Sequence, residues 1–161
     1  MRPNATPAPP ARHQAMTGRS GRLAWSTRHV AGATASGFLV VACFEVAVAL
    51  GAPFGRATMG GANPGRLPPE LRIVAAVVAA FWLLAVVHAL SRGGFTDRFT
   101  RAGNPRLTWV LLGVTALGAL MNAASSSPWE RYGWAPYTLL LMILCLGLAR
   151  SVPASGPDDV R

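Results

Sequence analysis

A single carboxylate, Glu45, lies within an apolar run of membrane-spanning length between residues 30 and 55. A helix needs about 20 mostly apolar residues to cross the hydrocarbon core of a bilayer. The nine Leu, Val and Phe residues of residues 30–50 contribute about −3 to −5 kcal/mol to insertion, whereas one central charge costs roughly 2.5 to 3.5 kcal/mol. The carboxylate must therefore find a partner within a helix bundle or carry a proton. An ionisable group inside a membrane is by default a candidate functional residue.

Three other polar side chains are expected on the same side of the membrane as Glu45. Arg72 begins the second apolar run, Asn122 lies near the end of the third, and Tyr137 begins the fourth. We expect Arg72 to reach toward Glu45, and Asn122 and Tyr137 to complete the hydrogen bonds of the carboxylate. Because buried polar groups often fix helix packing without chemistry, the favoured interpretation of this cluster is structural. Proton or substrate coupling at Glu45 is the alternative.

The remaining reactive side chains do not form a catalytic pattern. His88 lies near the far end of the second span, too distant from Glu45 for a proton relay, and is expected to snorkel to the interface. Cys43 and Cys145 are isolated within apolar runs and are expected to be packing residues. No nucleophilic triad or metal-ligand spacing is visible, and the glycine-rich loop 51–70 lacks the ending of a phosphate-binding loop. We therefore expect no catalytic, metal or cofactor site, and a protein that is not an enzyme.

Composition places the chain among membrane proteins. Of its 161 residues, 52% are hydrophobic and 13% are charged, against about 25% charged in a typical globular protein. The net charge of +9 comes from arginines beside the apolar runs, where anionic lipid headgroups attract them. No soluble domain is expected that would carry a nucleic-acid-binding face. The lipid bilayer is therefore the expected partner, and nucleic acid is not.

The apolar runs predict an all-α fold, a bundle of four transmembrane helices. Residues 1–26 are rich in proline, glycine and arginine and are expected to form a disordered tail. The membrane domain is expected over residues 27–151, with spans at about 30–50, 71–90, 105–124 and 137–149. Residues 152–161 are expected to be a disordered C-terminal tail.

Helix starts are marked by proline and capping residues. Pro69 and Pro105 fit the first helical position, with Asn104 as the cap of the third span. Before the fourth span, Ser127 is the expected cap, and Glu130 is expected to return to the cap amide as a capping box. This segment is expected to form a short interfacial helix that bends near residue 136.

Small residues predict which helix faces pack against protein. Small residues four apart allow a neighbouring helix to approach closely, and the second span carries two such pairs, Ala75/Ala79 and Ala76/Ala80. In the third span, one face is small and polar: Thr115, Gly118, Ala119 and Asn122. We expect this face to point into the bundle and the leucine-rich remainder toward lipid.

The arginine distribution predicts the orientation. With both termini on one side, that side carries eleven arginines and the other carries four. The positive-inside rule therefore predicts cytoplasmic N- and C-termini in a multi-pass protein of the cell membrane.

Several motifs resemble a family of small four-span bacterial membrane proteins that is common in actinobacteria. The motifs are LGAPFG (50–55), the Gly60-Gly61 pair, LPPELRI (67–73) and NAASSSPWER (122–131). Phe54 stands where family members usually carry Trp. The resemblance covers about residues 37–150 and implies a four-helix membrane fold, but it implies no particular activity.

Two functions remain after these exclusions. The sequence favours a structural or partner-binding membrane component, associating with itself or with another membrane protein. The alternative is a small proton-coupled transporter that uses Glu45 and releases a proton when a lipophilic cation binds.

Overall fold

The computed structural model describes residues 14–96 and 104–151, with side chains from Thr27 onwards. Over these residues the chain is helical, without strands. The four long helices are α1 (Gln14–Ala49), α2 (Pro69–Arg92), α3 (Pro105–Ala124) and α4 (Ala135–Arg150). Two 3₁₀ turns, Gly55–Ala57 and Met59–Gly61, lie between α1 and α2, and a π-helical turn, Glu130–Trp134, runs directly into α4. The expected all-α fold is confirmed.

Four segments are long and apolar enough to cross a membrane: Thr27–Ala49, Pro69–Arg92, Pro105–Ala124 and Glu130–Arg150. The length and composition of these helices are those of a multi-pass membrane protein. The fourth segment begins earlier than predicted, because the residues before Ala135 are already helical. No separate interfacial helix forms, and the wider π-helical turn takes the place of the expected bend.

α1 also begins earlier than the predicted span. The structure continues this helix back to Gln14, whereas a disordered tail was expected through residue 26. The last proline of the N-terminal region is Pro10, so no residue after it blocks helix extension from the span. Residues 1–13 and 152–161, which complete the two predicted tails, lie outside the described residues.

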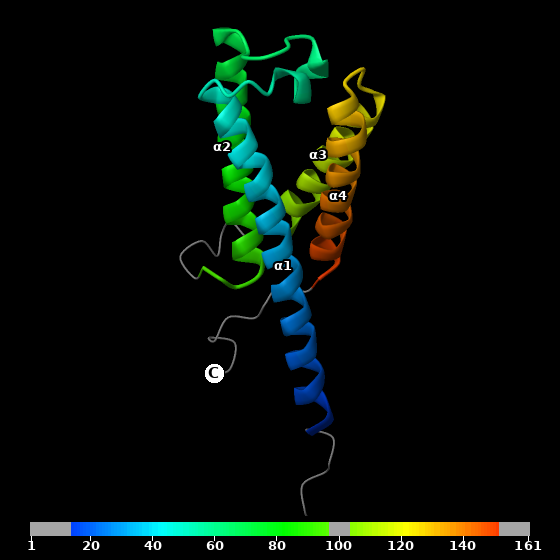
Figure 1. The fold of residues 1–161 in the computed structure, drawn as a ribbon. Helices are drawn as coiled ribbons and strands as arrows, with labels where there is room; N and C mark the ends of the chain where they lie inside the picture. Colours follow the sequence, from blue (N-terminus) through cyan, green and yellow to red (C-terminus); the bar gives the residue numbers. More distant parts are fainter. Residues whose placement is uncertain (1–13, 97–103, 152–161) are drawn as a thin grey trace, which may run out of the picture.

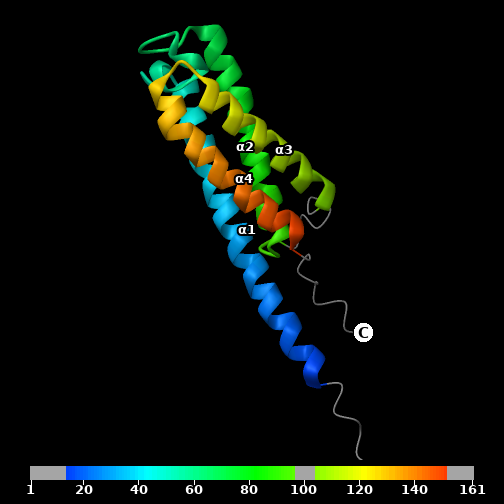
Figure 2. The same ribbon diagram turned by 90° about the vertical axis from the view of Figure 1, so that its right-hand side faces the viewer.

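The helices form two pairs. α1 packs along α2 and α3 along α4, and the pairs meet mainly through α1 and α4 (Figures 1 and 2). The α1–α2 loop and the α3–α4 turn, residues 125–129, lie at one end of the molecule, which we call the loop end. The N-terminal part of α1 extends beyond the other helices at the opposite end.

Small residues allow the helices to approach closely in the core. The buried core contains four alanines with a few larger side chains: Ala31, Ala35, Ala85, Ala89, Phe38, Leu111, Leu141 and Leu148. Ala75 and Ala79 on α2 are also buried, as expected for a small-residue contact, whereas Ala76 and Ala80 are exposed. Only one of the two predicted alanine pairs therefore packs within the chain.

The predicted inward face of α3 is confirmed. Thr115 is buried, and Gly118, Ala119 and Asn122 are partly buried. On the opposite side of the same helix, Leu117, Leu120 and Met121 are exposed, as expected for side chains that face lipid.

His88 does not snorkel as predicted. Its side chain is only 2% exposed, and Nε2 lies 2.9 Å from the Thr108 hydroxyl oxygen of α3. A hydroxyl that faces the ring from a neighbouring helix satisfies an imidazole nitrogen within the bundle, so the ring need not reach the interface. The pair links α2 to α3, two helices that otherwise contact each other little.

Candidate functional site

Two arginines close the end of α1 at the loop end. The final carbonyl groups of a helix have no partner within the helix. Arg72 Nε donates to the carbonyl oxygen of Ala49 and Arg66 Nε donates to that of Gly51, both at 2.9 Å. Gly51 has a φ of 95°, a conformation that favours glycine and turns the chain away from the helix axis. These contacts hold the start of the α1–α2 loop against α2.

The loop then makes a tight left-handed turn. Met59, Gly60 and Gly61 have φ values of 51°, 74° and 72°, so two of the three positions are occupied by the residue that adopts positive φ at least cost. Met59 is the exception, and its side chain packs against the buried cluster of Val48, Leu67 and Ala75. Packing of Met59 therefore supports a backbone conformation that is unfavourable for this residue alone.

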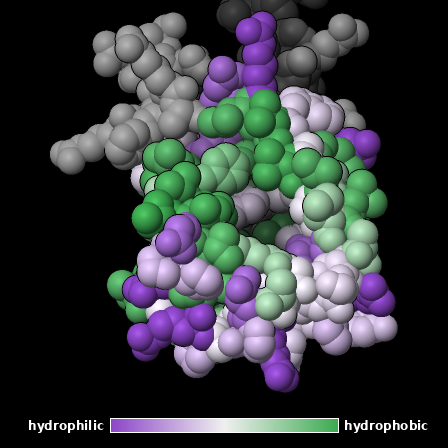
Figure 3. Space-filling view, turned by 90° about the horizontal axis from the view of Figure 1, so that it is seen from above, coloured by the Kyte–Doolittle hydropathy of each residue, from purple (hydrophilic) through white to green (hydrophobic). Residues whose placement is uncertain are grey.

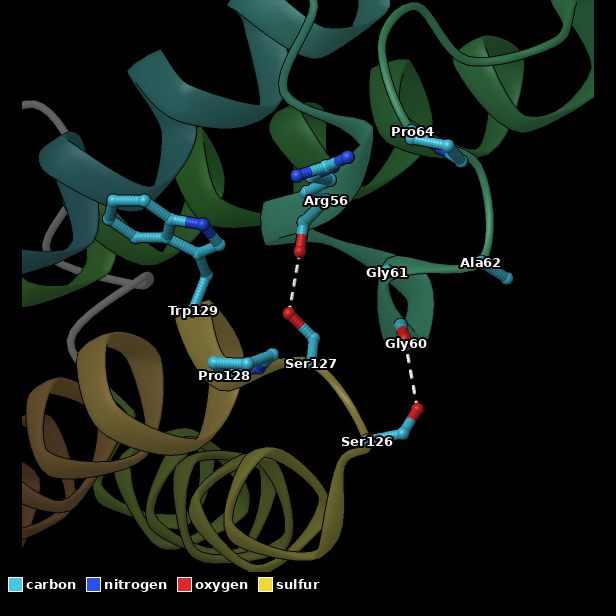
Figure 4. A pocket seen from close by; sticks show the side chains of 9 residues that line it. All are labelled: Arg56, Gly60, Gly61, Ala62, Pro64, Ser126, Ser127, Pro128 and Trp129. Carbon is cyan, nitrogen blue, oxygen red and sulfur yellow. Dashed lines mark hydrogen bonds between the residues drawn. The ribbon is translucent and has the colours of Figure 1, made fainter.

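This turn is hydrogen-bonded to the α3–α4 turn. The Gly60 amide donates to Glu130 Oε1 at 2.9 Å, and the Ser126 hydroxyl donates to the Gly60 carbonyl oxygen at 3.1 Å. The Ser127 hydroxyl donates to the carbonyl oxygen of Arg56. Figure 4 shows the last two bonds, with Ser126 and Ser127 directed toward the loop across a surface cavity of about 530 Å³.

The capping box predicted at residues 127–130 is only half present. The Glu130 amide donates to the Ser127 hydroxyl oxygen at 3.4 Å, as expected for a cap. The Glu130 carboxylate, however, does not return to the cap amide, which instead donates to the Ser125 hydroxyl oxygen. The Glu130 carboxylate instead accepts a hydrogen bond from the Gly60 amide. This donor is 70 residues away in sequence, and the loop places it beside the start of the helix.

A second, smaller cavity lies beneath the loop, between the two helix pairs. Its volume is about 190 Å³. All four helical spans and the loop contribute to its wall: Val41, Phe44 and Glu45 of α1, Ala57–Met59 of the loop, Trp82 of α2, Gly118 and Asn122 of α3, and Glu130, Trp134 and Thr138 of the fourth span. We call it the Glu45 cavity. Seen from the loop end, hydrophilic residues gather along one side of the molecule, and a hollow opens near its centre (Figure 3).

Glu45 is half-buried in this wall. Within the residues that the structure describes, no hydrogen bond or ion pair reaches its carboxylate. A carboxylate without a protein partner in a partly open cavity can bind water, a proton or an external cation. Glu45 is therefore the chemically unsatisfied group of the cavity.

Three aromatic side chains contribute to the wall of the cavity. Phe44, Trp82 and Trp134 line it, and the Phe44 and Trp134 rings pack with centroids 4.7 Å apart in an edge arrangement. The faces of such rings attract cations. Glu130, only 7% exposed, contributes a second carboxylate. The cavity thus combines two acidic groups with three large aromatic side chains.

The structure brings together two of the four residues predicted as a polar cluster. Asn122 shares the Glu45 cavity, and its amide nitrogen lies 3.5 Å from the Thr138 hydroxyl oxygen. Arg72 instead caps α1, and the Tyr137 hydroxyl donates to the carbonyl oxygen of Gly37 at 2.8 Å. In both cases a main-chain carbonyl is the partner in place of the expected carboxylate.

Sequence reasoning did not place Glu130 or Trp134 in the site. Glu130 was interpreted as a local cap because it follows Ser127 by three residues, and Trp134 fell within the segment that was expected to form a short interfacial helix. The sequence did place the acidic Glu130 on the same side of the membrane as Glu45. That position alone does not distinguish a residue of a shared site from a local cap, because the distinction depends on how the helices pack.

Other chemistries find little support in the described part of the chain. Among residues 14–96 and 104–151, no group of three or more His, Cys, Asp or Glu side chains is placed to hold a metal ion. Cys43 is exposed and Cys145 is buried, and each is free within the described residues. No family model, curated protein or solved structure matches this chain.

Proposed function

We propose that the protein is a small proton-coupled transporter that binds a small organic cation at Glu45. The observation that carries the proposal is the half-buried Glu45 carboxylate, which lines a cavity and has no partner among the described residues. The structural interpretation of Glu45 depended on a pairing with Arg72, and Arg72 donates to Ala49 instead. A group that only fixed helix packing would be expected to bond to a neighbouring helix.

The chemistry of the wall supports a cation as the ligand. Glu45 supplies the counter-charge and the aromatic rings supply favourable faces for an ammonium group. The cavity of about 190 Å³ is smaller than the roughly 300–1,000 Å³ of typical drug-sized sites, which favours an alkylammonium ion over a large cation. In the empty site Glu45 carries a proton. As the cation enters, that proton leaves to water and the carboxylate pairs with the cation.

The orientation is part of the proposal. Counted along the sequence with both termini on one side, eleven of the fifteen arginines belong to that side, so the loop end is assigned to the outside of the cell membrane under the positive-inside rule. The Glu45 cavity would then receive its ligand from the outer face.

Binding and flux test the proposal. The purified protein is titrated with methylammonium, tetramethylammonium and tetraphenylphosphonium, and tryptophan fluorescence is recorded because Trp82 and Trp134 line the cavity. We expect saturable changes with at least one of the two small cations in the wild type and none in Glu45→Gln. Glu70→Gln is the matched control, since Glu70 is exposed in the first turn of α2 and lines no described cavity. Uptake into proteoliposomes should occur with the wild type and with Glu70→Gln, and should be absent with Glu45→Gln. Equal binding by the wild type and Glu45→Gln would contradict the proposal.

A second candidate function, association with another membrane helix, has one observation in its favour. Ala76 and Ala80 form an exposed small-residue pair on α2, a pattern that allows close helix contact. Under this alternative the protein is a structural component that forms a homo-oligomer or binds a membrane partner. Ala76→Ile with Ala80→Ile should then reduce the mass of the detergent-solubilised assembly in light scattering. An unchanged mass would remove this support.

A further inference from the structure

Glu130 belongs both to the cavity and to the contact that holds the loop. Glu130 lines the Glu45 cavity, and its Oε1 accepts a hydrogen bond from the Gly60 amide. The loop residues Ala57, Thr58 and Met59 line the same cavity. One buried acidic residue thus links the cavity to the loop that forms part of its wall.

We propose that Glu130 is a gating residue, which holds loop residues 57–61 in place at the partly open Glu45 cavity and releases them when a cation enters. A carboxylate binds a cation more strongly than it binds a neutral amide, because both partners then carry charge. A cation in the cavity therefore competes with the Gly60 amide for Glu130. This inference rests on the proposed function for the identity of the ligand, whereas the closure itself rests on the observed contacts.

Gly60 and Gly61 are the positions at which the loop backbone can change conformation at the least cost. Glycine adopts positive and negative φ at similar cost, so these two positions can change conformation without steric strain. The other contacts that hold the turn are hydrogen bonds from the Ser126 and Ser127 hydroxyls and the packing of Met59. Ser126 is exposed, so water replaces its hydrogen bond readily. Ser127 and Glu130 are both buried, but of these two only Glu130 lines the Glu45 cavity, so its bond is the one that the cavity contents can alter.

Cysteine accessibility tests the closure without any ligand. Gly118 lines the cavity, and a Cβ at this position would meet no atom within 4 Å, so Gly118→Cys places a thiol in the site without a clash. Cys43, which is exposed, is replaced by alanine in this background. The rate of modification by a membrane-impermeant cationic methanethiosulfonate then reports entry into the cavity.

Removing the carboxylate should open the cavity. We expect Glu130→Ala to raise the modification rate roughly fivefold to tenfold, the effect of losing one buried hydrogen bond. Glu130→Gln keeps an acceptor oxygen and should raise the rate less, and Glu70→Ala should leave it unchanged. Ser126→Ala removes a hydrogen bond that water replaces and should change the rate little. If Glu130→Ala does not fold, Glu130→Gln takes its place, and its smaller increase should still be measurable. Unchanged rates in Glu130→Ala, or in Glu130→Gln where that variant replaces it, would overturn the assignment.

Hydrogen exchange tests the release. Addition of tetramethylammonium should increase amide exchange in the peptide that contains Gly60 in the wild type, and have no such effect in Glu45→Gln. If no cation binds while Glu130→Ala still opens the cavity, the proposed function fails and the closure stands. If cations bind but exchange at Gly60 is unchanged, the gating role of Glu130 is wrong and the proposed function stands.

Discussion

Substitution of Gly55 by alanine should destabilise the loop that covers the Glu45 cavity. A Cβ at this position would lie 1.8 Å from the carbonyl oxygen of Asn63 and 2.8 Å from that of Gly65. Both contacts are with main-chain atoms, so no side-chain rotation relieves them. The Gly55 amide also donates to the Gly65 carbonyl oxygen at 2.8 Å, and this bond cannot survive the displacement that an added methyl group requires.

The expected cost follows from these two effects. Overpacking of a tight contact costs about 1–3 kcal/mol, and a lost hydrogen bond costs about 0.5–1.5 kcal/mol. Gly55→Ala should therefore lower the free energy of unfolding by about 1.5–4.5 kcal/mol. Because the loop forms part of the cavity wall, the same variant should also increase modification of Gly118→Cys.

The assay is reversible unfolding in mixed detergent micelles, followed by circular dichroism and tryptophan fluorescence. Gly113→Ala is the matched control, since an added Cβ there meets no atom within 4 Å. Replacing a helical glycine by alanine in open space should be neutral or stabilising by up to about 1 kcal/mol. If Gly55→Ala unfolds at the same detergent concentration as the wild type, the described loop conformation is wrong.

Three further substitutions test the packing and the cavity. Tyr137→Phe removes the hydroxyl that donates to the Gly37 carbonyl oxygen, and thermal unfolding should show a loss of about 0.5–1.5 kcal/mol; no change in the unfolding temperature would argue against this contact between α1 and α4. Thr108→Val removes a hydrogen-bond partner of buried His88 and should cost about 1–3 kcal/mol in the same assay. Wild-type stability of this variant would contradict the His88 contact. Gly118→Leu should fill much of the cavity and abolish the fluorescence response to small cations while the far-ultraviolet circular dichroism stays unchanged, and a retained response would place the cation elsewhere.

The sequence was sufficient to predict the number and type of the long helices. Apolar length identifies a membrane span directly, because the thickness of the bilayer sets the number of residues that a helix needs. Proline and asparagine then located the start of α3 correctly, since the Asn104 side chain accepts the Arg106 amide at 3.0 Å. Such signals are local, so they can be interpreted without knowledge of the tertiary structure.

The site was less predictable because it depends on contacts between distant segments. Asn122 lines the same cavity as Glu45, because depth and helix face are both set by position in a span, but its amide faces Thr138 and does not bond to the carboxylate as expected. Arg72 was not placed correctly, because a long side chain at a helix start can reach either a carboxylate or the open carbonyl groups of a preceding helix. Which of these partners Arg72 binds depends on the direction in which the α1–α2 loop leaves the end of α1.

Glu130 illustrates the same limit. Its spacing from Ser127 is that of a capping box, and the competing donor, the Gly60 amide, lies 70 residues away. Only the left-handed turn at residues 59–61 brings that amide within reach. A short-range pattern therefore predicted the helix start correctly and gave the wrong partner for the carboxylate.

Proton release on cation binding is the most direct test of the central claim that Glu45 exchanges a proton for a cation. The detergent-solubilised protein is mixed with tetramethylammonium in weakly buffered solution, and a pH indicator records the protons released per bound cation. The account predicts about one proton per cation for the wild type, because one carboxylate is exchanged, and none for Glu45→Gln. Cation binding without proton release, or equal release from both proteins, would contradict it.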